Sequence, residues 1–237
     1  MHAFLLLTED PTALSRPDPN TLPQQTLMEL LLGDFDDKQI FRKPDGSFKA
    51  LGQWKGVTVN DVMEVTQISW APRNPFEIRT RLVIRDPIEA RQLYAPTAKA
   101  GGSIDFKWIP STVRKLAIYK MNLRGTINTW VLPPELDAEF NVSSNSLDGT
   151  VDTAGFPRRL WTIDISENNL SGYFDLTVLP PRLRNLNVSE NMFCGTADFS
   201  RLPEAIWRLN LSKNKFTGRI DLAELRNTEA SIFLDKN

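Results

Sequence analysis

Hydrophobic and polar positions in the second half of the chain follow a block that returns at a nearly constant interval. Each block alternates apolar and polar residues as a half-buried strand does, for example LWTIDISEN, LRNLNVSEN and IWRLNLSKN, which begin at Leu160, Leu183 and Ile206. Glycines keep the same frame, with successive gaps of 23, 24, 23, 23 and 23 residues, at Gly102, Gly125, Gly149, Gly172, Gly195 and Gly218. A fixed period of this size predicts an array of stacked repeats with one such strand in each.

Asparagines recur in the same frame, four residues before their glycines, at Asn145, Asn168, Asn191 and Asn214. We expect each of them to end a strand facing inward. There its amide can bond to backbone groups of the adjoining turn and of neighbouring repeats.

A second polar ladder lies three residues after the glycines, at Asp105, Asn128, Asp152, Asp175, Asp198 and Asp221. We expect these side chains to accept a hydrogen bond from a backbone N–H two or three residues further on. A calcium ladder is the alternative, but one carboxylate per repeat does not supply the roughly 6–8 oxygen ligands that calcium takes. No metal site and no cofactor are therefore expected.

The unit resembles the leucine-rich repeat, whose pattern L-x-x-L-x-L-x-x-N is matched by Leu183, Leu186, Val188 and Asn191. The resemblance covers residues 102–237. It implies an α/β repeat solenoid, an arc of about six parallel strands with an N-terminal helical cap.

Two further segments refine the resemblance. The tail of the unit, N-x-F/L-x-G-x-x-D-F/L-x-x-L-P, is similar to the protist variant found in trypanosomatid-like leucine-rich repeat proteins, and it is related to the plant-type unit. Upstream, W-x-G-V at residues 54–57, followed by a strand-like segment at 65–70, looks like the N-terminal cap of these families. Val59 stands where an extracellular plant-type cap would carry a cysteine.

Residues that precede the repeats divide into a leader and a cap. The leader, residues 1–20, is rich in proline and polar residues and is expected to be poorly ordered or docked. The cap, residues 21–101, begins with an expected amphipathic helix at 21–33, in which Leu27, Leu30 and Leu31 share a face and Gly33 provides the stop. This helix should cover the edge of the first repeat's core, because a solenoid needs its ends covered.

The cap is interrupted at residues 71–101, which form an insertion much longer than the usual connection of about 4–6 residues. Residues 76–85 alternate apolar and polar side chains, which predicts a half-buried strand with Arg79, Arg81 and Arg85 on its outer face. Long insertions in repeat proteins often lie on a binding face. The alternative is an extra strand on the cap whose arginines are only solvated.

In a leucine-rich repeat the strands line the concave surface, and the x positions point away from the core. Trp161, Arg184 and Trp207 occupy the first x position of three successive repeats, and adjacent strands lie about 4.8 Å apart. A guanidinium between two indoles would form a stacking ladder, and such clusters carry binding energy at protein interfaces. The alternative is that both indoles lie against neighbouring side chains and bind nothing. The candidate partner-binding residues of this face are Trp161, Arg184, Trp207, Arg208, Lys115, Asp164, Asn187 and Asn210.

Composition narrows the classes of partner and of chemistry. The 28 basic and 29 acidic side chains balance, so nucleic acid is not the leading partner. Cys194 and His2 are the single cysteine and the single histidine, too few for a disulfide scaffold or a four-ligand zinc site. No segment approaches the roughly 20 apolar residues of a membrane span. The apolar run at residues 3–7 is too short for the hydrophobic region of a signal peptide. A cytoplasmic location is expected, with the cell surface possible if the N-terminus is incomplete.

The sequence therefore favours a non-catalytic module that binds another protein through its concave face. No glycine-rich phosphate loop, serine elbow or HExxH motif is present, so no catalytic residues are expected. Two alternatives stay open, namely a structural subunit of a large assembly and a fragment of a surface-protein ectodomain. Residue 237 falls on the asparagine position of the sixth strand, so we expect an array that stops in mid-repeat. Either the chain is a fragment or a partner chain covers the edge near Phe233.

Overall fold

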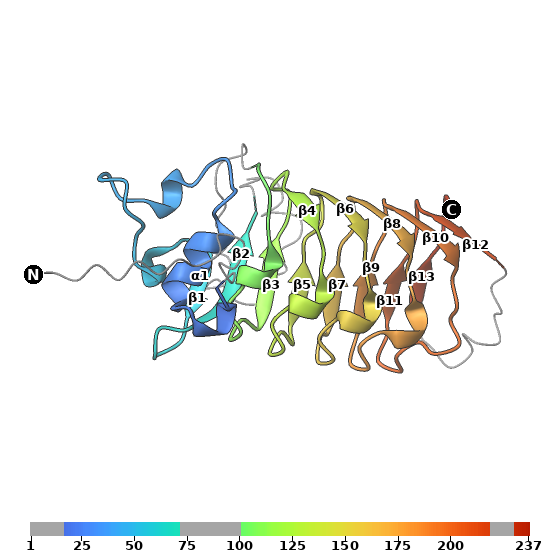
Figure 1. The fold of residues 1–237 in the computed structure, drawn as a ribbon. Helices are drawn as coiled ribbons and strands as arrows, with labels where there is room; N and C mark the ends of the chain where they lie inside the picture. Colours follow the sequence, from blue (N-terminus) through green and yellow to red (C-terminus); the bar gives the residue numbers. More distant parts are fainter. Residues whose placement is uncertain (1–16, 72–100, 219–229) are drawn as a thin grey trace, which may run out of the picture.

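The computed structural model describes residues 17–71, 101–218 and 230–237. Within these residues the chain is an elongated solenoid, with the cap at one end and successive turns stacked along one axis (Figure 1). The leader up to residue 16 and most of the 71–101 insertion, with Arg79, Arg81 and Arg85, lie outside the described residues.

One face of the solenoid is an eight-stranded sheet in the order β1, β2, β3, β5, β7, β9, β11, β13. β1 pairs with β2 in antiparallel fashion, and every later pair is parallel. The strands are β1 (Val57–Val59), β2 (Val65–Trp70), β3 (Lys115–Ile118), β5 (Glu139–Asn141), β7 (Thr162–Asp164), β9 (Asn185–Asn187), β11 (Arg208–Asn210) and β13 (Ser231–Phe233). The expected repeat solenoid is confirmed, and the parallel array is one strand longer than the six repeats because the cap strand β2 joins it.

A second, five-stranded parallel sheet forms where each turn passes its glycine, a feature that the sequence pattern did not predict. Its strands are β4 (Arg124–Thr126), β6 (Ser146–Thr150), β8 (Asn169–Tyr173), β10 (Met192–Thr196) and β12 (Lys215–Thr217), in the order β12, β10, β8, β6, β4. Gly172 shows why glycine is needed here: its φ is +84°, and an added Cβ would lie 2.8 Å from the Thr150 methyl group.

Short 3-10 helices follow the second sheet, and the second polar ladder starts them. Asp105, Asn128, Asp152, Asp175 and Asp198 each accept a bond at 2.8–3.2 Å from the N–H two residues on, which confirms the expected capping role. The helices that follow four of these caps are η4 (Phe106–Trp108), η5 (Thr129–Val131), η6 (Thr153–Gly155) and η7 (Leu176–Val178). The position of Asp221 lies outside the described residues.

The asparagine ladder joins consecutive turns through the core. Asn168 accepts a bond from Leu147 N–H at 3.0 Å and donates to the carbonyls of Val142, Ile165 and Ser166 at 3.0–3.1 Å. Asn145, Asn191, Asn214 and Asn237 repeat the arrangement. The predicted role of these amides is confirmed.

Phenylalanines fill the centre of the solenoid beside this ladder. Phe140 lies between Phe106 and Phe156, with ring centroids 5.8 and 5.9 Å apart. Phe193 lies between Phe174 and Phe216, at 5.0 and 6.5 Å. Edge, tilted and stacked contacts of this kind add to the burial of apolar area, so each of these two groups of rings joins neighbouring turns.

The cap ends the solenoid with a hairpin and one helix. Helix α1 (Gln24–Leu31) is shorter than the expected 21–33, because η1 (Pro19–Thr21) and Pro23 precede it and the chain turns after Leu32. Leu27 and Leu31 are buried as expected, but the placement of Leu30 on the buried face is wrong, since its side chain is 37% exposed. Two further 3-10 helices, η2 (Gln39–Phe41) and η3 (Leu51–Gln53), complete the cap.

Aromatic side chains and one glutamine join this cap to the sheet. Trp54 is 2% exposed, and its ring centroid lies 4.8 Å from that of Phe41. Gln24 at the start of α1 accepts a bond from Val65 N–H at 2.6 Å and donates to the Thr112 hydroxyl at 3.0 Å. These contacts hold the helix against β2 and the first repeat.

Candidate functional site

The concave face is formed by the outward side chains of the eight-stranded sheet, and its rows repeat once per turn. The row that begins at Asn141 continues through Asp164, Asn187 and Asn210. In all four turns the side-chain Oδ1 accepts bonds from the N–H and the hydroxyl of the serine two residues on, at 2.6–3.2 Å. The same atoms thus build the same polar turn four times in succession.

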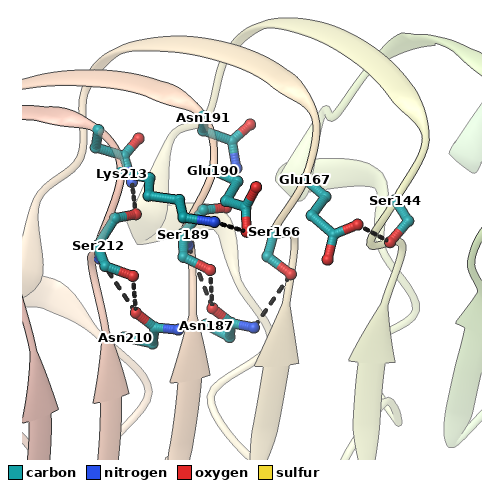
Figure 2. A network of polar contacts seen from close by, with 11 residues as sticks. Ser144, Ser166, Glu167, Asn187, Ser189, Glu190, Asn191, Asn210, Ser212 and Lys213 are labelled. Carbon is teal, nitrogen blue, oxygen red and sulfur yellow. Dashed lines mark hydrogen bonds and ion pairs between the residues drawn. The ribbon is translucent and has the colours of Figure 1, made fainter. Parts of the chain in front are cut away.

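Figure 2 shows part of this row, with the Asn187 amide directed toward Ser166 of the preceding turn. Asn187 Nδ2 lies 3.1 Å from the Ser166 hydroxyl and 3.3 Å from Asp164 Oδ2. Asn141, Asn187 and Asn210 begin Asn-x-Ser triplets, the acceptor pattern for N-glycosylation. Asp164 makes the same turn with Ser166, although aspartate cannot carry an N-linked glycan. The turn itself therefore accounts for the triplets.

Charged side chains lie beyond the serines, where each strand has turned toward the second sheet. Lys213 Nζ lies 2.7 Å from Glu190 Oε1, and the Ser144 hydroxyl donates to Glu167 at 2.7 Å (Figure 2). Glu167, Glu190 and Lys213 have positive φ angles of +54°, +57° and +56°. The turns therefore project these side chains away from the core. This end of the concave face is therefore ordered by contacts between neighbouring turns.

A shallow polar hollow of about 420 Å³ lies on the first half of the concave face, over β3 to β9. Lys115 and Glu139 form an ion pair on its floor, at 3.3 Å. Burial raises the pKa of Asp164, against the hydrogen bonds from Ser166 and Asn187 that lower it. The floor of the hollow is thus polar but internally satisfied.

The other notable part of the face is its edge at the start of the strands, which we call the aromatic edge. It comprises Trp161, Arg184, Trp207 and Arg208 at the start of their strands, together with Phe233 at the end of β13, whose ring Arg208 covers. Arg184 N–H donates to the Trp161 carbonyl at 2.8 Å, and Trp207 N–H donates to the Arg184 carbonyl at 3.0 Å, so the three residues stand on consecutive rungs. Trp161 is 47% exposed and Trp207 61%.

Arginines of the aromatic edge stack on rings, but not in the symmetric ladder expected from the sequence. The guanidinium carbon of Arg184 lies 4.8 Å from the Trp161 ring centroid, and that of Arg208 lies 5.5 Å from the Phe233 ring. No contact between Arg184 and the Trp207 ring is found in the described part of the chain. The expected stack of one arginine between two indoles is therefore replaced by two separate pairs, and the Trp207 face is left open.

Toward the cap, the same edge is ionic rather than aromatic. Arg114 pairs with Asp137, and Arg159 lies 3.3 Å from Glu135 and 3.7 Å from Asp137. The bond to Asp137 raises the pKa of Arg114. The extra residue of this turn lies between Leu136 and Glu139, because Leu136 N–H bonds to Pro133 as in the other turns, whereas Glu139 pairs with Lys115, 24 residues earlier.

The candidate residues on the described strands therefore fall into two groups. Lys115, Asp164 and Asn187 line the hollow, and Asn210 continues its row. Trp161, Arg184, Trp207 and Arg208 form the edge. The sequence pattern did not predict that Arg208 covers the Phe233 ring. Alignment of the repeats could have suggested this contact, because the two residues lie on neighbouring strands.

A cluster of metal ligands and a long apolar helix are both absent from the described residues. Among them, no three His, Cys, Asp or Glu side chains are placed to hold a metal ion. No helix in the described ranges is long and apolar enough to cross a membrane. The arrangement can bind a chain that lies across the strands, through stacking, amide hydrogen bonds and guanidinium groups.

Comparison with known proteins finds structures of the same fold but no matching family model or curated protein. The structure of a pollen receptor kinase 3 superposes with a TM-score of 0.61 at 17% identity, over 90% of this chain and 93% of the other. The BIR3–SERK2 complex from Arabidopsis thaliana matches at 0.58 and 19%, over 83% and 96%.

Longer structures share the same fold. The leucine-rich repeat ectodomain of the Arabidopsis receptor kinase HAESA, solved with an extended IDA peptide hormone, matches with a TM-score of 0.62 at 17% identity. The match covers 92% of this chain, which spans only 33% of the HAESA structure. Together with the 23-residue steps between paired strands and the asparagine ladder, these matches identify the chain as a leucine-rich repeat solenoid.

Proposed function

We propose that the chain is a non-catalytic module that binds a peptide or protein segment across its concave face. The observation that carries the proposal is the aromatic edge, where two exposed indoles and two arginines stand on neighbouring rungs. Tryptophan and arginine are enriched among the residues that dominate binding energy at protein interfaces. The polar hollow beside the edge would add hydrogen bonds that fix the register of the partner.

Similar structures support this use of the fold. HAESA was solved with a peptide hormone, PEPR1 with AtPEP1, and BIR3 with SERK2. Several are named ectodomains of receptor kinases, so the expected cytoplasmic location finds no support in them. A cell-surface ectodomain is accordingly the second candidate, and immunostaining of intact against permeabilised cells distinguishes the two locations.

Finer features belong to the same proposal. The repeat tail supports the protist variant of the leucine-rich repeat, with W-x-G-V at residues 54–57 as its cap. Val59, in place of the cysteine of an extracellular plant-type cap, weakens a secreted location. Phe233 is 42% exposed at the last described strand, which makes this part of the sheet a further contact for a partner. Arg79, Arg81 and Arg85 of the insertion remain candidates for a second contact.

The test is capture of a partner from a native extract, followed by mass spectrometry, with the wild type and a Trp161→Ala/Trp207→Ala variant. Trp130→Ala is the matched control, because Trp130 is 66% exposed on η5, outside the concave sheet. We expect the double variant to lose at least about tenfold in captured partner. A partner captured equally by all three proteins would place binding elsewhere on the molecule.

A further inference from the structure

The spacing of the two exposed indoles suggests a particular conformation for the bound segment. Trp161 and Trp207 hold equivalent positions two turns apart, joined by the rungs through Arg184. Adjacent strands are about 4.8 Å apart, which places the two indoles about 9.6 Å apart along the solenoid. A segment that crosses the strands meets the two rings at this repeat.

Among the regular backbones, the polyproline II helix best combines that distance with two side chains on the same face. A polyproline II helix rises about 3.1 Å per residue and repeats every three residues, or about 9.3 Å, so residues i and i+3 present the same face. A β-strand would span the distance in about three residues, and its side chains at i and i+3 point to opposite faces. An α-helix offers i and i+7 at about 10.5 Å, and it is about 10–12 Å wide, broader than a single row of side chains.

The indole N–H groups provide a second, independent observation. Trp54, Trp70 and Trp130 donate theirs to protein acceptors at 2.7, 3.1 and 2.8 Å. In the described part of the chain, Trp108, Trp161 and Trp207 have no such acceptor, and of these three only Trp161 and Trp207 belong to the concave sheet edge. A polyproline II segment leaves its backbone carbonyls unpaired, and aromatic grooves that recognise such segments exploit this.

The charges on the concave face indicate which side chains the bound segment should carry. Cations on the first half of the concave face are neutralised, as in the pairs Arg114–Asp137 and Lys115–Glu139. Within the described residues, Arg184 and Arg208 have stacking partners but no carboxylate. The Arg184 rung lies between the rungs of the two indoles, opposite residues i+1 and i+2 of a segment whose residues i and i+3 meet the rings, and its guanidinium lies against Trp161.

We propose that the aromatic edge binds an acidic polyproline II segment of a partner protein. A proline at i packs on the part of Trp161 that Arg184 leaves exposed, and a proline at i+3 stacks on the open Trp207 ring. An aspartate or glutamate at i+1 or i+2 meets Arg184. This inference rests on the proposed function and names the class of its ligand. Arg208 beside Trp207 receives a second carboxylate further along the segment.

The test uses the full chain and a synthetic peptide of repeated Pro-Pro-Glu, with binding followed by calorimetry and by tryptophan fluorescence. Three peptides of equal length are controls: repeated Pro-Pro-Lys reverses the charge, repeated Gly-Ser-Glu keeps the charge without the conformation, and an Ala-rich helix with Glu tests the helical alternative. We expect Pro-Pro-Glu to bind at least about tenfold more tightly than each control and to weaken with added salt.

Variants assign the binding to the edge. Trp161→Ala, Trp207→Ala and Arg184→Gln should each weaken Pro-Pro-Glu binding about tenfold, and Trp130→Ala should leave it unchanged. The Arg184→Gln variant should also lose most of the preference for Pro-Pro-Glu over Pro-Pro-Lys. Thermal unfolding of each variant verifies that it is folded.

The inference is overturned if Pro-Pro-Glu fails to bind at up to about 1 mM. It is also overturned if Gly-Ser-Glu or the helical peptide binds as tightly, or if the edge variants bind like the wild type. A native partner whose capture requires Trp161 and Trp207, found together with no binding of Pro-Pro-Glu, would leave the proposed function standing and remove only the polyproline II assignment.

Discussion

Replacement of one ladder asparagine tests whether these amides hold the solenoid together. Asn168 is 9% exposed in the centre of the array and contacts three segments of backbone. Its Oδ1 accepts from Leu147 N–H at 3.0 Å, and its Nδ2 donates to the carbonyls of Val142, Ile165 and Ser166 at 3.0–3.1 Å. Asn168→Ala removes all of these bonds and leaves the Leu147 N–H without its acceptor.

The expected cost follows from the groups left behind. A buried N–H without an acceptor costs about 1–3 kcal/mol, and each hydrogen bond lost by the two amide protons contributes about 0.5–1.5 kcal/mol. The free energy of unfolding should therefore fall by roughly 2–6 kcal/mol. Asn185→Ala is the matched control, since Asn185 is half-buried on β9 and its amide makes one long bond, 3.3 Å to the Thr162 hydroxyl. Its cost should stay within about 0.5 kcal/mol.

Urea unfolding, followed by far-ultraviolet circular dichroism, measures the global cost. Because a repeat array can unfold in parts, hydrogen exchange of the Leu147 amide provides the local measurement. Asn168→Ala should speed exchange at Leu147 far more than exchange in the cap. The reasoning would be refuted if Asn168→Ala and Asn185→Ala lost equal stability, or if Leu147 exchanged at its wild-type rate in Asn168→Ala.

Three further substitutions probe other parts of the fold. Burial raises the pKa of Asp164. Between the ordinary aspartate pKa and this raised pKa, the folded state binds more protons than the unfolded state, so the free energy of unfolding falls as pH rises through that window. Asp164→Asn, measured by thermal unfolding at several pH values, should remove this slope and raise neutral-pH stability by roughly 1 kcal/mol; an unchanged slope would contradict it. Gly172→Ala should lose about 1–2 kcal/mol for its positive φ and more for the contact with Thr150, whereas Gly46→Ala, with φ +85° and open space, should show the backbone cost alone. Phe193→Ala should cost about 3–5 kcal/mol in urea unfolding, because this fully buried ring fills the centre of the later turns, and a loss below about 1 kcal/mol would argue against the ring stack.

Within the candidate site, agreement between sequence and structure depends on how local each feature is. The exposure of Trp161, Arg184 and Trp207 followed from the register of the repeats, because one position per turn always faces outward. Which ring each arginine covers did not follow, since Arg184 could reach either neighbour, and packing selected Trp161 for it and Phe233 for Arg208. The x positions near Leu136 were ambiguous for a related reason: an extra residue was visible, but only the backbone pairing decides where it is absorbed.

The sequence by itself determined the period, the strands of the concave face, the asparagine ladder and the turn caps, such as Asp152. Each of these is written into every repeat, and a repeated local preference needs no distant partner to be recognised. Only the tertiary structure decided the second sheet, the exposure of Leu30, the Gln24 contacts of the cap and the arginine–ring pairs. These depend on contacts between side chains from different turns or from the cap, and their free energies appear only once the turns are stacked.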